Sequence, residues 1–272
     1  MGERLTRDDR RITTGAGVYR VLSSIRAPDA ATSGRPRPHA VVLIHGIGTS
    51  HRYLAKLHAE FETAGDVYSI DLPGFAGLPK PGTAPGVAAM AAGLARVLDE
   101  LGVSDAVLVG HSMGAQWVVE LAVERPDLAA TVVAIGPVAD DRHRTLLAQS
   151  AALGLDVLGE TPAVNAVVLV DYLRCGPVWF LRESRPMLTY PLEDRVALLT
   201  MPFLVLRGGN DPIAGTSWCR RLRDRAPHGR FVVVPGHRHV VQFTAPRAVA
   251  AGIRSFLAGI AAGEPRAGAW VS

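Results

Sequence analysis

Cysteine is almost absent from this sequence, and long apolar runs are missing altogether. Cys175 and Cys219 are the only two cysteines among 272 residues, so we expect neither a disulfide framework nor a cysteine-based metal site. No run of 18 apolar residues occurs, which predicts no membrane-spanning helix and no membrane partner. The charged first residues are not followed by an apolar segment, so we expect no signal peptide and a cytoplasmic protein.

Dense basic segments are missing as well. The net charge is +4, but the arginines are scattered along the chain, which indicates a solvated surface and no nucleic-acid partner. Apolar residues make up 48% and charged residues 20% of the chain, as is typical of a globular protein. A chain of 272 residues is long enough for one large core with a smaller cap.

Short apolar runs recur along the chain and alternate with helical patterns. Most of these runs are apolar at every position and rich in β-branched residues, which predicts buried strands of a parallel sheet with right-handed crossovers. The runs are 41–44, 66–70, 106–109, 131–135, 203–206 and 231–234. A looser alternation over 11–25, around Gly15 and Gly17, predicts an antiparallel pair at the sheet edge. The fold class is therefore α/β.

The alternation breaks between residues 138 and 198. This stretch has helical spacing but no clean strand, and it is too long to be a bare loop. We expect it to form a small helical cap over one end of the sheet. The core is then made of residues 1–137 and 199–272.

A serine between two glycines stands where a buried strand gives way to a helix. The sequence there is Gly110-His111-Ser112-Met113-Gly114. In this context Gly-x-Ser-x-Gly is the nucleophile elbow, in which the glycines make room for a strained serine that projects from the sheet. Ser112 is therefore the candidate nucleophile, and the backbone N–H of Met113 is expected to face the developing oxyanion.

A serine nucleophile needs a base, and the base needs an acid that orients it. Asp211 follows the strand at 203–206, and His239 follows the strand at 231–234, so the order is serine, acid, histidine. Asp140 and Asp141 stay open as alternative acids, and Asp211 has a second reading as a residue that caps the turn before Pro212. His237 stays open as an alternative base.

The second oxyanion donor is expected after the first buried strand. His45-Gly46-Ile47-Gly48 is a tight glycine-rich turn, and by position we expect the Ile47 N–H to be the donor, with Gly46 next. His45 and His111 are expected to form hydrogen bonds beneath the site. Asp71 is expected to have a structural role.

Four segments together resemble the α/β-hydrolase superfamily, in particular its esterase and C–C-hydrolase-like branch with a helical cap. They are residues 45–48, 71–77, 110–114, and 208–211 with the later histidine. The resemblance covers 41–257 and implies an eight-stranded, mostly parallel sheet, a cap after the sixth strand, no cofactor and no metal. Pro246 lies seven residues after His239, as is common in the family, and favours His239 over His237. Arg238 departs from the small residue that the family often has before its histidine.

The complete set of candidate residues predicts hydrolysis of a carboxylic ester with a small to medium acyl group. Substrate contacts are expected from Gly46, His51, Trp179 and Phe180. Tyr53, like His51, follows the turn at 45–48 closely and is a further candidate for lining the pocket. The alternatives are a C–C bond hydrolase of ring-cleavage dienoates, with Arg174 and Arg182 as carboxylate partners, or a lactonase. A non-enzymatic ligand-binding protein is a further alternative. We expect a monomer or a homodimer acting on a small-molecule ester or related carbonyl substrate.

Overall fold

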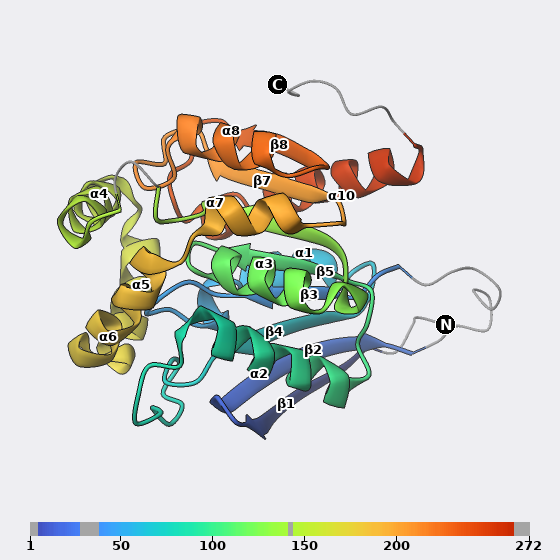
Figure 1. Cartoon of the computed structure of the whole chain (residues 1–272), viewed down its shortest axis with the longest axis horizontal. Helices are drawn as coiled ribbons and strands as arrows, with labels where there is room; N and C mark the ends of the chain where they lie inside the picture. The colour runs from blue at the N-terminus through green and yellow to red at the C-terminus, as the bar shows by residue number, and fades with distance from the viewer. Residues whose placement is uncertain (1–4, 28–37, 141–143, 264–272) are drawn as a thin grey trace.

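The protein is an α/β structure built on one eight-stranded sheet (Figure 1). This computed structural model describes residues 5–27, 38–140 and 144–263. The strands are β1 (Leu5–Thr14), β2 (Gly17–Arg26), β3 (Val41–Ile44), β4 (Val67–Asp71), β5 (Ala106–His111), β6 (Ala129–Ile135), β7 (Phe203–Gly208) and β8 (Gly229–Val234). Their order in the sheet is β1-β2-β4-β3-β5-β6-β7-β8. The six predicted runs and the antiparallel edge pair are all present.

The sheet is parallel from β4 to β8 and antiparallel at the β1 edge. β1 pairs with β2, and β2 pairs with β4, in antiparallel register, whereas β3, β4, β5, β6, β7 and β8 pair in parallel. The carboxyl ends of the parallel strands therefore share one edge, where ligand sites of open α/β sheets form. The eight-stranded, mostly parallel sheet that the resemblance implied is confirmed.

Helices cover both faces of the sheet, which is why the central strands are apolar at consecutive positions. The helices are α1 (Ala55–Phe61), α2 (Gly86–Leu101), α3 (Gly114–Glu124), α4 (Leu146–Gly159), α5 (Pro162–Cys175), α6 (Pro177–Thr189), α7 (Leu192–Arg195), α8 (Thr216–Arg225), α9 (Val241–Thr244) and α10 (Pro246–Ala261), with short 3-10 turns at His51–Tyr53, Pro126–Leu128 and Val196–Leu198. In β3, Val42 and Ile44 join the core on the α2 and α3 side, while Val41 and Leu43 join the core beneath α1 and α10. Both faces of the strand are thus buried.

The break in the alternation corresponds to a helical insertion between β6 and β7. Helices α4, α5 and α6 form most of it, and they gather at one side of the molecule, at the left in Figure 1. The three helices are called the insertion helices below. Assignment of residues 138–198 as a cap separate from the core stays a prediction.

Candidate active site

Ser112 lies in a strained turn between β5 and α3. Its φ is +58°, a left-handed conformation that is rare for a residue with a side chain. A Cβ on Gly110 would collide with the carbonyl of Gly114, and a Cβ on Gly114 would lie 2.6 Å from the carbonyl oxygens of Ile44 and His45. The two glycines therefore let β5, the turn and α3 approach closely enough to hold Ser112 in this conformation.

His239 and Asp211 form a buried pair at the ends of β8 and β7. Nδ1 of His239 lies 2.9 Å from Oδ2 of Asp211, and both residues are at most 5% exposed. The other carboxylate oxygen, Oδ1, accepts the backbone N–H groups of Ile213 and Ala214 at 2.8 and 2.9 Å. Asp211 is thus fixed by bonds from its own loop and presents one oxygen to the imidazole.

The electrostatics of the pair favour its charged forms. Burial disfavours the Asp211 carboxylate, but the neighbouring His239 and the hydrogen bonds outweigh burial, so the pKa of Asp211 lies below its ordinary value. Burial also lowers the pKa of His239, but Asp211, together with Asp156 and Glu160, reverses the effect and raises that pKa. The imidazole is therefore a stronger base than an unperturbed histidine.

The alternative base, His237, and the alternative acid, Asp140, have other hydrogen-bond partners. His237 Nδ1 contacts Thr244 Oγ1 at 3.0 Å, so the histidine that faces Asp211 is His239. Asp140 accepts from Arg221 at 2.6 Å and joins the loop after β6 to α8. Asp141 lies outside the described residues.

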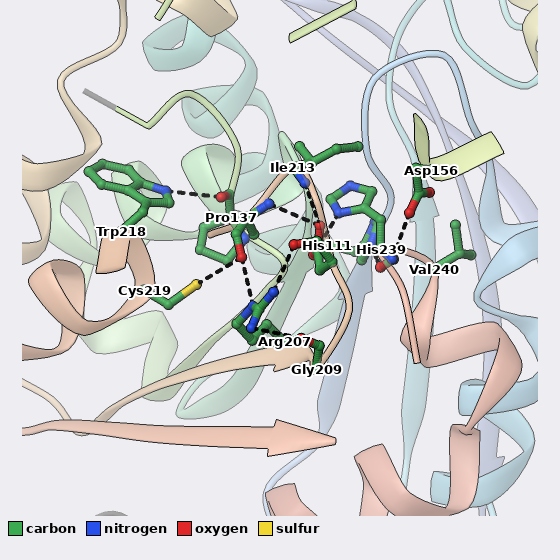
Figure 2. A network of polar contacts seen from close by, with 12 residues as sticks. His111, Pro137, Asp156, Arg207, Gly209, Ile213, Trp218, Cys219, His239 and Val240 are labelled. Atoms are coloured by element: carbon green, nitrogen blue, oxygen red, sulfur yellow. Dashed lines mark hydrogen bonds and ion pairs between the residues drawn. The ribbon is translucent and has the colours of Figure 1, made fainter. Parts of the chain in front are cut away.

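Arg207 is a site residue that the sequence analysis missed. Its buried guanidinium donates to the backbone carbonyls of Gly209, Asp211 and Ala214 at 2.7 to 3.2 Å (Figure 2). It therefore holds the acid loop at three points. An arginine inside an apolar strand was the available signal, because a buried guanidinium must find acceptors.

A chain of hydrogen bonds beneath the site links the turn after β3 to the histidine loop. Gly46 N–H donates to the Tyr53 hydroxyl at 2.7 Å, and that hydroxyl contacts His111 Nδ1 at 2.5 Å. Burial lowers the pKa of His111 to about 3, so this imidazole is neutral and its Nε2–H donates to the His239 carbonyl at 3.0 Å. His111 and Tyr53 thus set the relative positions of the two loops.

The hydrogen bonds distinguish the candidate oxyanion donors. Gly46 N–H is taken by Tyr53, which makes it a poor candidate for the oxyanion donor. No hydrogen bond of the described residues uses the backbone N–H of Ile47 or Met113. Ile47 lines the same cavity as Ser112, and Met113 directly precedes α3, whose N-terminus carries partial positive charge. The geometry leaves these two N–H groups available.

Ser112 and His239 open onto one cavity that the insertion helices cover. Of the predicted contacts, Gly46, Ile47 and Phe180 line the cavity. Most of the other lining residues come from the insertion helices, and among them are the apolar side chains of Leu146, Leu153, Val157, Val164, Val168 and Met187. No hydrogen bond between Ser112 Oγ and His239 occurs among the described residues; such contacts often tighten only when substrate binds.

Two predicted contact residues, His51 and Trp179, are not among the residues that line this cavity. The His51 ring and backbone N–H contact the buried Asp71 carboxylate, each at 2.6 Å, because that acid requires partners. Trp179 is 1% exposed and packs on Gly74 and Phe75. Its indole fills the contact between α6 and the loop after β4.

Hydrogen bonds join α4 and the residue after it to the loop that carries His239. Asp156, 2% exposed, accepts the His239 N–H at 3.1 Å, and Glu160 accepts the Val240 N–H at 3.4 Å (Figure 2 shows the Asp156 contact). Arg238 reaches back to the Leu155 carbonyl at 3.1 Å. The arginine that departs from the family pattern is therefore part of this connection. No periodic pattern predicts this connection, because the contacts join residues about 80 positions apart.

Basic side chains are scarce around the cavity. His111 and His239 are the basic residues that line it within the described ranges, while Asp156 and Glu160 add two carboxyl groups. Arg174 is exposed on α5, and Arg182 is exposed and turned to the Gly82 carbonyl at 3.5 Å. Neither arginine lines the cavity. Among the described residues, no group of three or more His, Cys, Asp or Glu is arranged to hold a metal ion.

The chain is similar to known proteins in sequence and in fold. A model of the family described as "Alpha/beta hydrolase family" matches residues 41–252. The chain is 27% identical over 253 residues to the esterase YbfF of Escherichia coli, covering 86% of this chain and 98% of the relative. It is 25% identical to the (E)-2-((N-methylformamido)methylene)succinate hydrolase of Acinetobacter baylyi, covering 87% and 96%. An esterase structure from Thermogutta terrifontis superposes with a TM-score of 0.75 at 23% identity, covering 93% and 99%.

Proposed function

The chain belongs to the alpha/beta hydrolase family, and from this premise we propose that it is a serine hydrolase of uncharged carboxylic esters. The proposal names Ser112 as nucleophile, His239 as base and Asp211 as the acid that orients it. Residues 138–198 serve as the cap that shapes the acyl site. The observation that carries the proposal is the strained Ser112 elbow, which shares a cavity with the buried His239–Asp211 pair.

The mechanism follows from the positions of these groups. His239 Nε2 takes the Ser112 proton as Oγ bonds to the substrate carbonyl carbon, and Asp211 stabilises the imidazolium. The N–H groups of Ile47 and Met113 hold the oxyanion. When the intermediate collapses, the ester C–O bond breaks and His239 returns the proton to the leaving alcohol. A water then gives a proton to His239 and attacks the acyl carbon; the bond from that carbon to Ser112 Oγ breaks, His239 returns the proton to Oγ, and the acid leaves.

The charge around the cavity supports an uncharged acyl group. Asp156 and Glu160 face the cavity and no arginine or lysine of the described residues lines it, so a substrate carboxylate would lack a partner there. A dienoate C–C hydrolase would need such a partner, and neither Arg174 nor Arg182 supplies it. The A. baylyi relative is named for a succinate substrate, and on this reasoning the present chain differs from it in specificity.

The primary test is hydrolysis of p-nitrophenyl esters from acetate to decanoate by wild type and Ser112→Ala. We expect the variant to lose about 10⁴-fold or more in kcat, as is typical when a serine nucleophile is removed. Ser150→Ala is the matched control, because Ser150 lines the same cavity from α4. Retention of more than a tenth of the wild-type rate by Ser112→Ala would reject the proposed nucleophile.

The charge preference is tested with two esters of similar length. We expect kcat/KM for p-nitrophenyl butyrate to exceed that for p-nitrophenyl hemisuccinate at least tenfold at pH 8, because the second substrate brings a carboxylate toward Asp156 and Glu160. The Asp156→Asn variant should reduce this ratio. Equal turnover of the two esters would contradict an uncharged acyl site without affecting the proposal for Ser112.

A further inference from the structure

The outer surface of the insertion helices is strongly apolar. Ten of the twelve large apolar side chains that the described residues expose lie between residues 146 and 181. They are Leu146, Leu147, Leu155, Val157, Leu158, Leu169, Val170, Leu173, Val178 and Leu181. Leu147, Leu155 and Leu158 recur at helical spacing, so they share one side of α4, and Leu158 is 85% exposed. Such clustering marks an interaction surface, since single exposed leucines are ordinarily scattered.

Charge is sorted by sign across the same helices. Their acidic residues, Asp156, Asp171 and Glu183, are all buried, whereas their basic residues, Arg174, Arg182 and Arg185, are all exposed. The outer surface therefore presents leucines, valines and arginines without an exposed carboxylate on α4, α5 or α6. This combination is typical of elements that lie at the interface of an anionic lipid layer.

We propose that the outer surface of the insertion helices docks on the surface of an anionic phospholipid bilayer. No single helix of the described residues is long and apolar enough to cross a membrane. Helices α5 and α6 together are long and apolar enough to cross a membrane, but the chain bends by 95° at the break between them. The bend places two apolar stretches at an angle, which suits contact with the surface layer.

The sorted charges favour lipid over a second copy of the chain. In a two-fold dimer through this surface, the same patch of both copies would meet, and the exposed arginines would be brought toward one another. Like charges in contact oppose association, whereas anionic headgroups neutralise the arginines. Lys80 adds another cation, because its amino group lies close to Gly176 between α5 and α6.

The apolar surface is continuous with the catalytic cavity. Ser150, Leu153 and Val157 line the cavity above Ser112, and they also line a shallow groove on α4 that extends to Leu155 and Leu158. A docked molecule would therefore place a lipid-facing groove on the same residues of α4 that wall the catalytic cavity. Docking itself requires no turnover, so it stands independently of the proposed chemistry.

The test is sedimentation of protein with sucrose-loaded vesicles, carried out in the Ser112→Ala variant so that no lipid is hydrolysed. We expect binding to vesicles of phosphatidylglycerol and phosphatidylcholine in equal parts. Changing Leu147, Leu158 and Leu173 together to Gln should weaken the partition at least tenfold. Leu198→Gln is the matched control, because Leu198 is 56% exposed on a different element, and it should bind as before.

A second set of variants tests the arginines. Arg174→Gln with Arg182→Gln should weaken binding about 25-fold, from about 1 kcal/mol per basic residue near an anionic surface. Arg247→Gln, at a 91% exposed side chain on α10, should have no such effect. Binding should also fall as salt rises. The proposal is overturned if vesicles do not sediment the protein, or if the leucine variants bind like the control. It is also overturned if analytical ultracentrifugation shows a dimer that the leucine changes dissociate.

Discussion

Backbone clearance at single glycines decides whether the Ser112 turn can form. A Cβ on Gly110 would collide with the Gly114 carbonyl, whereas Gly154, inside α4, has nothing within 4 Å of the corresponding position. We therefore predict opposite effects of the same substitution. Gly110→Ala should lower the free energy of unfolding by about 2 kcal/mol or more, as overpacking does, and Gly154→Ala should raise it by about 0.5 to 1 kcal/mol through helix propensity.

Urea unfolding of the two variants measures this difference. Ester hydrolysis should be lost in Gly110→Ala and retained in Gly154→Ala. A Gly110→Ala protein with wild-type stability and activity would show that the turn tolerates a side chain, and the argument for a strained serine would fail.

The sequence predicted the residues of the turn and the buried pair better than it predicted the cavity walls. Ser112, Asp211 and His239 each follow a strand at the same sheet edge, so strand periodicity was sufficient to bring them together. His51 and Trp179 depend on side-chain direction, which periodicity does not determine. The His51 ring is directed to the Asp71 carboxylate by a hydrogen bond, and the absence of a side chain at Gly74 leaves the space that the Trp179 indole fills.

At the scale of elements, α6 packs against α2 and also buries an ionisable side chain, Glu183. Glu183 is 0% exposed, and neither of its carboxylate oxygens has a hydrogen-bond partner among the described residues. Burial raises its pKa from 4.5 to about 7. The folded chain therefore holds this proton between pH 4.5 and 7, while the unfolded chain releases it, so the free energy of unfolding falls as pH rises through this window.

Glu183→Gln should remove this pH dependence. Relative to wild type, the variant should gain at most about 3 kcal/mol of stability between pH 5 and pH 8, at about 1.4 kcal/mol per pKa unit. Urea unfolding at the two pH values measures the gain. Glu100→Gln, which removes an exposed carboxylate on α2, is the matched control. An equal gain in both variants would contradict a buried, protonated Glu183.

The strands were predicted closely because a strand that is buried on both faces has apolar residues at consecutive positions. The insertion helices were predicted as helical, but their boundaries were not. Their outer sides carry leucines where a globular surface would carry polar residues, so the usual two-sided pattern is weak. Helix α4, for example, exposes Leu155 and Leu158 and buries Asp156.

At the scale of the whole molecule, α4 connects the insertion to the base of the proposed reaction. Asp156 both accepts the His239 N–H and contributes to the raised pKa of that imidazole. Because the base must be neutral to accept a proton, its raised pKa sets the pH below which activity declines. Removing the Asp156 charge should lower that pKa, so the acid limb of kcat/KM against pH should move to lower pH in Asp156→Asn.

Asparagine retains an oxygen that accepts the His239 N–H, so this variant changes charge more than position. Asp156→Ala removes the acceptor as well and should lower kcat in addition to moving the limb. Asp171→Asn separates this effect from loss of a buried acid in general, since Asp171 bonds to Ser50 at 2.6 Å and does not line the cavity. Its pH profile should keep the wild-type position even where stability falls. If all three variants shift the acid limb equally, the link from α4 to His239 acts through overall stability and not through the local charge.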